Sequence, residues 1–384
     1  MRLRNLVIWA LLDTALGFPI AALACENVRL DLDPKVLGKV PAMKQGKISA
    51  CFSTTAVQLI DAYRFSNGDV DYNFLSSPIV LGSESGDILS EGGTVKDSLI
   101  RAQSVGTCST RETARFLGND QGSEFLEFLA KNYSLARGRS YNPLLKQNIQ
   151  SLSKTQYFEQ DNGGNFENLD SLRSVTFARD MPKVQKKRPK YTADQKMAAQ
   201  DICQRLKTLG LEDASVTRIL EFLTESRQIF ISRILGSLCK ERKSLKFLPN
   251  PTMEDAWTTG PSGVAPPNSA VRESKINLAI DQALKNKRPV AIEFCNEAVT
   301  SLEHEGKYNE KGEWICEKNG QHAAVVVGSK TNAIGGCFYL VRDSYCDQYP
   351  KQWSGLSKKD VCAGGQYWIP SGRLLKNTRA AIHF

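Results

Sequence analysis

Residues 45–53, with the sequence QGKISACFS, lead into a segment that alternates apolar and polar side chains at helical spacing. The apolar positions are Phe52, Ala56, Leu59, Ile60 and Tyr63. This spacing predicts a helix over residues 50–63, with Cys51 in its first turn. The positive end of a helix stabilises a thiolate, the nucleophilic form of cysteine. A cysteine at a helix start is also often a small buried apolar residue, so Cys51 alone does not decide the chemistry.

A candidate base for Cys51 is His322, in the stretch 320–328 with the sequence GQHAAVVVG. The apolar run predicts a buried strand, and a histidine at its mouth is held in a fixed position. A histidine at such a rim can also be purely structural. The next apolar strand, over residues 338–342, is followed by Asp343, which can accept a hydrogen bond from the imidazole and orient it. An aspartate after a strand is otherwise a common turn former.

Five segments in this order resemble the papain-like cysteine peptidase family: residues 45–53, 92–93, 320–323, 343–345 and 364–369. The resemblance covers roughly residues 40–110 and 274–370. It implies an α+β, two-lobed papain-like fold, with a helical lobe that carries the catalytic helix and an antiparallel β lobe. Together with the N-terminal segment described below, the resemblance implies a bacterial exported member of the family.

The resemblance also implies roles for four residues. Cys51 attacks the scissile carbonyl, His322 exchanges the proton and Asp343 orients His322. Gln45 stands six residues before the nucleophile, as in the family, and would donate its side-chain N–H to the oxyanion beside the backbone N–H of Cys51.

Three more residues are assigned to substrate binding by the same resemblance. Gly92 and Gly93 match the glycine pair at which a peptide substrate lies in extended form, with Gly93 making the backbone contact. An ordinary turn before a helix would look the same. Tyr345, like Phe52, stands where papain has a tryptophan that flanks the site.

One departure from the family affects the reaction type. The family usually has asparagine at the position of Asp343, and a Cys-His-Asp triad is similar to that of transglutaminases. The alternatives are therefore an acyl transferase or hydrolase acting on protein glutamine or cell-wall amides, and a catalytically idle binding scaffold. The partner expected for the enzyme is a protein or peptide substrate.

Residues 1–24 read as a signal peptide, because a basic start and an apolar run precede the small residues Ala22 and Ala24. A membrane anchor is the alternative, although Asp13 interrupts the apolar run. Cleavage after Ala24 leaves Cys25 first, which would allow membrane attachment through lipidation of Cys25. We expect an exported protein, in the periplasm, at the cell surface or outside the cell.

The chain has 10 cysteines, which in an exported protein are expected to be mostly disulfides. If Cys51 stays free, the other nine leave at least one further cysteine unpaired or modified. Cys346 is expected to pair with Cys362, and a bond between Cys203 and Cys239 is one way to hold the helices of residues 193–243 together. Without a C-x-x-C pair and with only 3 histidines, no metal is expected, and the resemblance implies no cofactor.

The organisation follows from these segments. After the signal peptide, residues 25–112 form the helical lobe and residues 273–384 the β lobe. Residues 113–272 are predicted to be a mainly helical insertion, with helices at about 193–209 and 214–243. This insertion is a candidate restraint on activity, a partner surface or a packing elaboration.

The distribution of charge argues against one class of partner. Lys and Arg number 50 against 41 acidic residues, a formal net charge of +9, and the only dense basic run is at residues 183–190. It lacks the interleaved aromatic side chains of a nucleic-acid surface, so no nucleic acid partner is expected.

Overall fold

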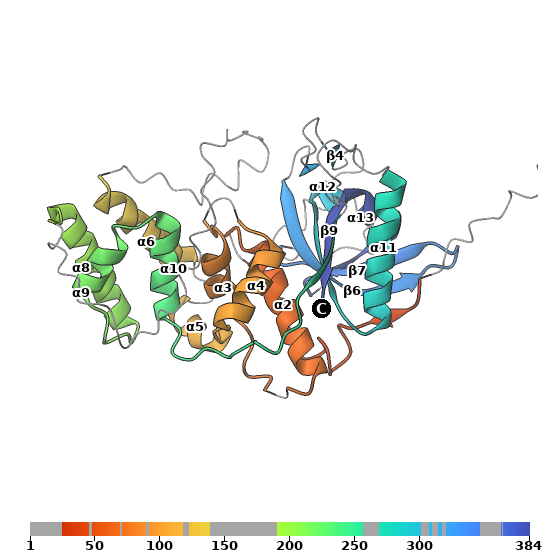
Figure 1. Ribbon diagram of the computed structural model, residues 1–384, viewed down its shortest axis with the longest axis horizontal. Helices are drawn as coiled ribbons and strands as arrows, with labels where there is room; N and C mark the ends of the chain where they lie inside the picture. Colours follow the sequence, from red (N-terminus) through yellow and green to blue (C-terminus); the bar gives the residue numbers. More distant parts are fainter. Residues whose placement is uncertain are drawn as a thin grey trace, which may run out of the picture.

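The computed structural model describes residues 25–45, 48–69, 71–89, 92–117, 123–138, 190–255, 269–300, 307–308, 314–316, 320–345, 362 and 364–384. The predicted signal peptide and residues 183–189 of the basic run lie outside these ranges. The fold is α+β, with most helices to one side of an antiparallel sheet (Figure 1).

The first group of helices is α2 (Cys51–Ser66), α3 (Pro78–Ser85), α4 (Val95–Val105) and α5 (Thr110–Leu117). The helix predicted over residues 50–63 is confirmed, and it begins at Cys51. Thr94 caps α4 by accepting the backbone N–H of Asp97, and Gly106 ends the helix with a φ of 78°.

The second group is α6 (Ser123–Ala136), α8 (Ala193–Thr208), α9 (Val216–Phe222) and α10 (Arg227–Ser237). A single helix over 214–243 is wrong, because the chain breaks between α9 and α10. Ser226 starts α10 by accepting the backbone N–H of Ile229, which gives the second helix its own cap. α10 packs against α3 and so joins the two groups.

The described strands of the main sheet are β1 (Val28–Arg29), β2 (Thr252–Asp255), β3 (Val290–Cys295), β6 (Gln321–Thr331), β7 (Cys337–Arg342), β8 (Gln366–Pro370) and β9 (Thr378–His383). Their order is β2-β9-β3-β6-β7-β8, with β1 paired to β6 and every pairing antiparallel. The short elements α12 (Glu297–Thr300), β4 (Lys307–Tyr308) and β5 (Trp314–Ile315) lie apart from this path.

Helices cover the central strand β6 from two sides. α2 packs against β6 on the side of the other helices, and α11 (Ser269–Lys285) contacts β3, β6 and β9 from the far side (Figure 1). α13 (Ser371–Asn377) follows β8 and packs on α11. α2 therefore lies directly against the strand that carries His322.

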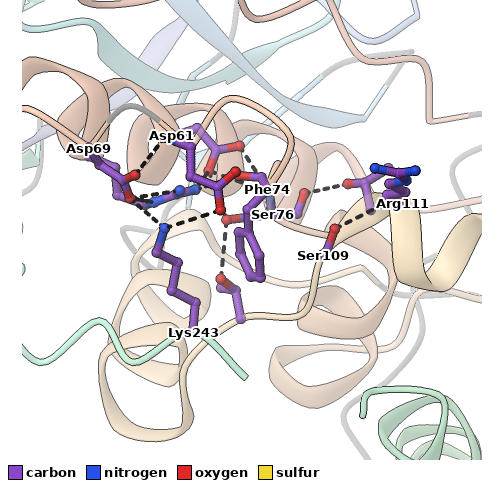
Figure 2. A network of polar contacts seen from close by, with 11 residues as sticks. Asp61, Asp69, Phe74, Ser76, Ser109, Arg111 and Lys243 are labelled. Atoms are coloured by element: carbon purple, nitrogen blue, oxygen red, sulfur yellow. Dashed lines mark hydrogen bonds and ion pairs between the residues drawn. The ribbon is translucent and has the colours of Figure 1, made fainter. Parts of the chain in front are cut away.

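A buried ionic network fixes the C-terminal half of α2 (Figure 2). Arg64 is fully buried, 2.8 Å from Asp61 and 2.8 Å from Asp69, and Lys243 lies 2.6 Å from Asp69. Asp61 also accepts hydrogen bonds from the backbone and hydroxyl of Ser76. Burial raises the pKa of Asp61 to about 6, although Arg64 and these hydrogen bonds lower it. The network ties α2 to the segment after α10.

Three disulfides lie within the described residues: Cys25–Cys337, Cys108–Cys239 and Cys295–Cys316. They indicate an oxidising environment. The hypothetical bond between Cys203 and Cys239 is not formed, because Cys239 is bonded to Cys108 and the buried thiol of Cys203 donates to the carbonyl of Ala214 at 3.3 Å.

Two other expectations concern Cys362 and Cys25. Cys362 is disulfide-bonded, but its expected partner Cys346 lies outside the described residues. The sulfur of Cys25 is bonded to Cys337, and a thioether-linked lipid would need that same sulfur, so this disulfide and lipidation of Cys25 exclude each other. Among the helices that the structure describes, none is long and apolar enough to cross a bilayer.

Candidate active site

The thiol of Cys51 lies at the N-terminus of α2 and is partly exposed. The preceding turn is held by a 2.9 Å hydrogen bond from the backbone N–H of Ser49 to the carbonyl of Ile88. No side chain caps α2, because Ala50 occupies the cap position. The unshared N–H groups of the first turn favour negative charge at Cys51.

His322 and Asp343 form a buried ion pair beside this thiol. Nε2 of His322 lies 3.0 Å from Oδ1 and 3.1 Å from Oδ2 of Asp343, and the two residues are 4% and 2% exposed. With Nε2 on the carboxylate, Nδ1 is the ring nitrogen left for the hydrogen bond with Cys51. The structure thus brings the three predicted triad residues into one chain of contacts.

The protonation of His322 follows from these contacts. Burial lowers the pKa of the imidazole, but the charge and hydrogen bond of Asp343, followed by the contact with Cys51, outweigh burial and raise the pKa to about 10. His322 is therefore an imidazolium at neutral pH. A positive imidazole beside a thiol at a helix N-terminus is the setting in which a thiolate is stabilised.

Aromatic rings fix the plane of the imidazole. The ring of Tyr345 stacks on His322 with the centroids 5.1 Å apart, and Phe294 meets it edge-on at 5.5 Å. Phe294 lies directly opposite His322 in the β3–β6 pairing. Tyr345, predicted from its position as a substrate-binding residue, is in direct contact with the base.

Gln45 joins the two halves of the site. Its backbone N–H donates to the carbonyl of Ser344 at 3.4 Å, and its side-chain carbonyl accepts the Ser344 hydroxyl. One side-chain N–H of Gln45 donates to the carbonyl of Ile48 at 2.7 Å. The amide is 1% exposed and carries a second N–H, so its predicted role at the oxyanion stays a prediction.

The glycine pair lies beside the nucleophile helix. Gly92 has a φ of 76° and exchanges two backbone hydrogen bonds of 2.8 Å with Asp87. Gly93 is exposed, and a Cβ added there would lie 2.7 Å from the ring of Phe52. Glycine is therefore required by the ring that follows Cys51, and the substrate contact of the pair stays a prediction.

Comparisons with known proteins give little further direction. No protein-family model and no curated protein matches the chain. A solved structure described as a crystal structure analysis of SERA5E from Plasmodium falciparum is similar, with a TM-score of 0.38 and 10% sequence identity over 93% of this chain and 95% of that chain. A likeness of this size assigns no chemistry, so the function rests on the geometry above.

Two contributors to the site have no role in the sequence prediction. Phe294 meets the ring of His322 and Tyr367 lies 3.3 Å from Asp343, and the sequence assigns no role to either residue, although Tyr367 belongs to the motif 364–369. Strand alternation was the available signal for Tyr367. Within the described ranges, no group of three or more histidine, cysteine, aspartate or glutamate side chains is arranged to hold a metal ion.

Proposed function

We propose that the chain is a papain-like cysteine peptidase that hydrolyses peptide bonds through Cys51, His322 and Asp343. The observation that carries the proposal is the buried imidazole, which contacts a carboxylate through Nε2 and a free, partly exposed thiol through its other ring nitrogen. A purely structural histidine does not need a thiol at a helix N-terminus as its second partner.

In the proposed reaction the Cys51 thiolate attacks the scissile carbonyl carbon, and the carbonyl oxygen becomes an oxyanion. The imidazolium of His322 then gives its proton to the leaving amine as the C–N bond breaks and a thioester remains. His322, now neutral, takes a proton from water, whose oxygen attacks the thioester. The acid product leaves and the thiolate–imidazolium pair is restored.

The surrounding residues have supporting roles in this proposal. Asp343 keeps His322 protonated and oriented, as expected from the pKa of about 10. The backbone N–H of Cys51 and the second side-chain N–H of Gln45 would stabilise the oxyanion. The exposed backbone at Gly93 would pair with an extended peptide.

A second candidate, acyl transfer to an amine, is favoured by the carboxylate at Asp343. Both reactions share the thioester and differ in the acceptor that resolves it. Turnover of an unstructured protein substrate with and without an added primary amine separates them, because only a transferase would attach the amine to the product. An idle scaffold would show neither product.

The experiment that tests the proposal compares the parent with Cys51→Ala and Cys203→Ala on an unstructured protein substrate. Cys203 is the matched control, because it is the other free cysteine of the described residues and is buried away from His322. We expect Cys51→Ala to abolish cleavage and Cys203→Ala to retain it. Equal cleavage by the parent and Cys51→Ala would refute the proposal.

The stretch 113–272 is proposed to be an elaboration of the helical lobe that restrains access to the site. Its support is the packing of α10 on α3 and the Cys108–Cys239 disulfide. A deletion that tests this role must keep β2, because Thr252–Asp255 pairs with β9 in the main sheet. We also propose that residues 1–24 direct export of the protein, and the three disulfides support this proposal.

A further inference from the structure

Tyr367 lies next to the carboxylate that orients the candidate base. On the β7–β8 ladder Tyr367 is directly opposite Val341, and Asp343 follows Val341 by two residues. Because side chains alternate along a strand, all three lie on one face of the sheet, and a tyrosine can reach a diagonal neighbour. The hydroxyl of Tyr367 lies 3.3 Å from Oδ2 of Asp343.

This hydroxyl can only donate to Asp343. Tyr367 is 2% exposed. Burial raises its pKa well above the ordinary value, and the charge and hydrogen bond of Asp343 raise it further, so the O–H keeps its proton. A protonated phenol beside a carboxylate is a fixed, charge-assisted donor.

The carboxylate of Asp343 is thereby held by three donors. Oδ1 receives the backbone N–H of Tyr345 at 2.8 Å, Oδ2 receives Tyr367, and Nε2 of His322 lies within 3.1 Å of both oxygens. The same turn of the chain also anchors the backbone, because the N–H of Asp343 donates to the carbonyl of Gly365 at 2.8 Å.

We propose that Tyr367 is a positioning residue for the proton-transfer machinery, which acts through Asp343 on His322. The inference rests on the proposed function. The Tyr367 hydroxyl stops the carboxylate from rotating out of the imidazole plane. By donating to Oδ2 it also lowers the proton affinity of Asp343, so that the shared proton stays on Nε2 of His322 and the ring remains available to Cys51.

A second buried tyrosine supplies a matched control. Tyr339 lies two residues before Val341 on β7, is fully buried and donates its hydroxyl to Asn277 and Asp281, at 2.8 Å each. Tyr339→Phe and Tyr367→Phe therefore remove the same atom from the same sheet, and each deprives a carboxylate of a donor. Only Tyr367 touches the carboxylate bound to His322.

The experiment measures two properties of the parent and both variants. The first is the proton resonance on Nε2 of His322 at neutral pH, which is assigned by its absence in His322→Gln. The second is the rate at which iodoacetamide alkylates Cys51. We expect Tyr367→Phe to move the resonance downfield, because Asp343 becomes a stronger acceptor, and to slow alkylation about fivefold. Tyr339→Phe is expected to change neither the resonance nor the alkylation rate, although we expect it to lower the melting temperature.

Each outcome has a separate meaning. An unchanged resonance and rate in Tyr367→Phe would overturn the inference, and so would equal changes in both tyrosine variants. Should Cys51 in the parent react no faster than a free peptide thiol, the proposed function fails, while the resonance still shows whether Tyr367 acts on the Asp343–His322 pair.

Discussion

Replacing Asp343 with asparagine removes the charge that keeps His322 protonated while it leaves a side chain of the same size. In the variant, burial of the imidazole is no longer outweighed by a carboxylate. We therefore expect the pKa of His322 to fall from about 10 to below its ordinary value near 6.5. At pH 7 the ring becomes neutral and no longer places a positive charge beside the thiol of Cys51.

The magnitude follows from linkage between protonation and folding. A folded pKa of about 10 against an unfolded value near 6.5 stabilises the parent by roughly 5 kcal/mol below pH 6.5, of which roughly 4 kcal/mol is present at pH 7. Because the folded pKa is the higher one, this contribution is lost as the pH rises through 10. Since an asparagine still accepts the His322 N–H, we expect Asp343→Asn to lower the free energy of unfolding at pH 7 by roughly 2 to 4 kcal/mol.

The assay is urea unfolding, with disulfides intact, of the parent and Asp343→Asn at pH values from 6.5 to 10.5. The difference in unfolding free energy should shrink by more than half across this range. Asp281→Asn is the control, because Asp281 is a half-buried carboxylate that accepts from Tyr339 and has no imidazole partner among the residues that the structure describes. Its difference should stay constant with pH. A loss for Asp343→Asn that is the same at pH 6.5 and 10.5, or a His322 that stays protonated at pH 8 in the variant, would refute the reasoning.

Two further substitutions test other parts of the structure. Gly93→Ala places a Cβ 2.7 Å from the ring of Phe52, so we expect the free energy of unfolding to fall by about 1–3 kcal/mol and the alkylation of Cys51 to slow. Unchanged values in both assays would contradict this packing argument. Arg64→Ala leaves Asp61 buried without its cation, which should cost about 3–5 kcal/mol by urea unfolding at pH 8 and less at pH 5, where Asp61 is protonated below its parent pKa of about 6. As a control, Arg205→Ala should change the free energy of unfolding by less than about 0.5 kcal/mol, because Arg205 is exposed. If Arg64→Ala causes a loss as small as that of Arg205→Ala, the proposed role of the buried network is wrong.

The predictable parts of the fold are those with a local signal. The helix that begins at Cys51 and the strands that lead to His322 and Asp343 are confirmed, because each is a continuous apolar pattern of one period. The helix over 214–243 is wrong because the apolar spacing continues across the break, which is made by the cap at Ser226. The spacing of apolar residues does not show where a capping residue ends one helix and begins the next.

Other features depend on contacts between distant parts of the chain. β2 and β9 pair with each other, although 122 residues separate the end of β2 from the start of β9 when counted between Asp255 and Thr378. The Cys25–Cys337 pair has a sequence separation of 312. Nothing local specifies such partners. Tyr367 belongs to the same class, because its contact with Asp343 exists only once β7 and β8 are in register.

The disulfide between Cys108 and Cys239 has a sequence separation of 131, so it closes a loop that contains α5, α6, α8, α9 and α10. If a protease cuts the backbone once inside this loop, the two fragments remain one covalent molecule. A non-reducing gel would show a single band and a reducing gel two. Maturation by an internal cut would therefore leave the fragment with Cys51 attached to the fragment with His322, and only a reductant would remove that covalent link.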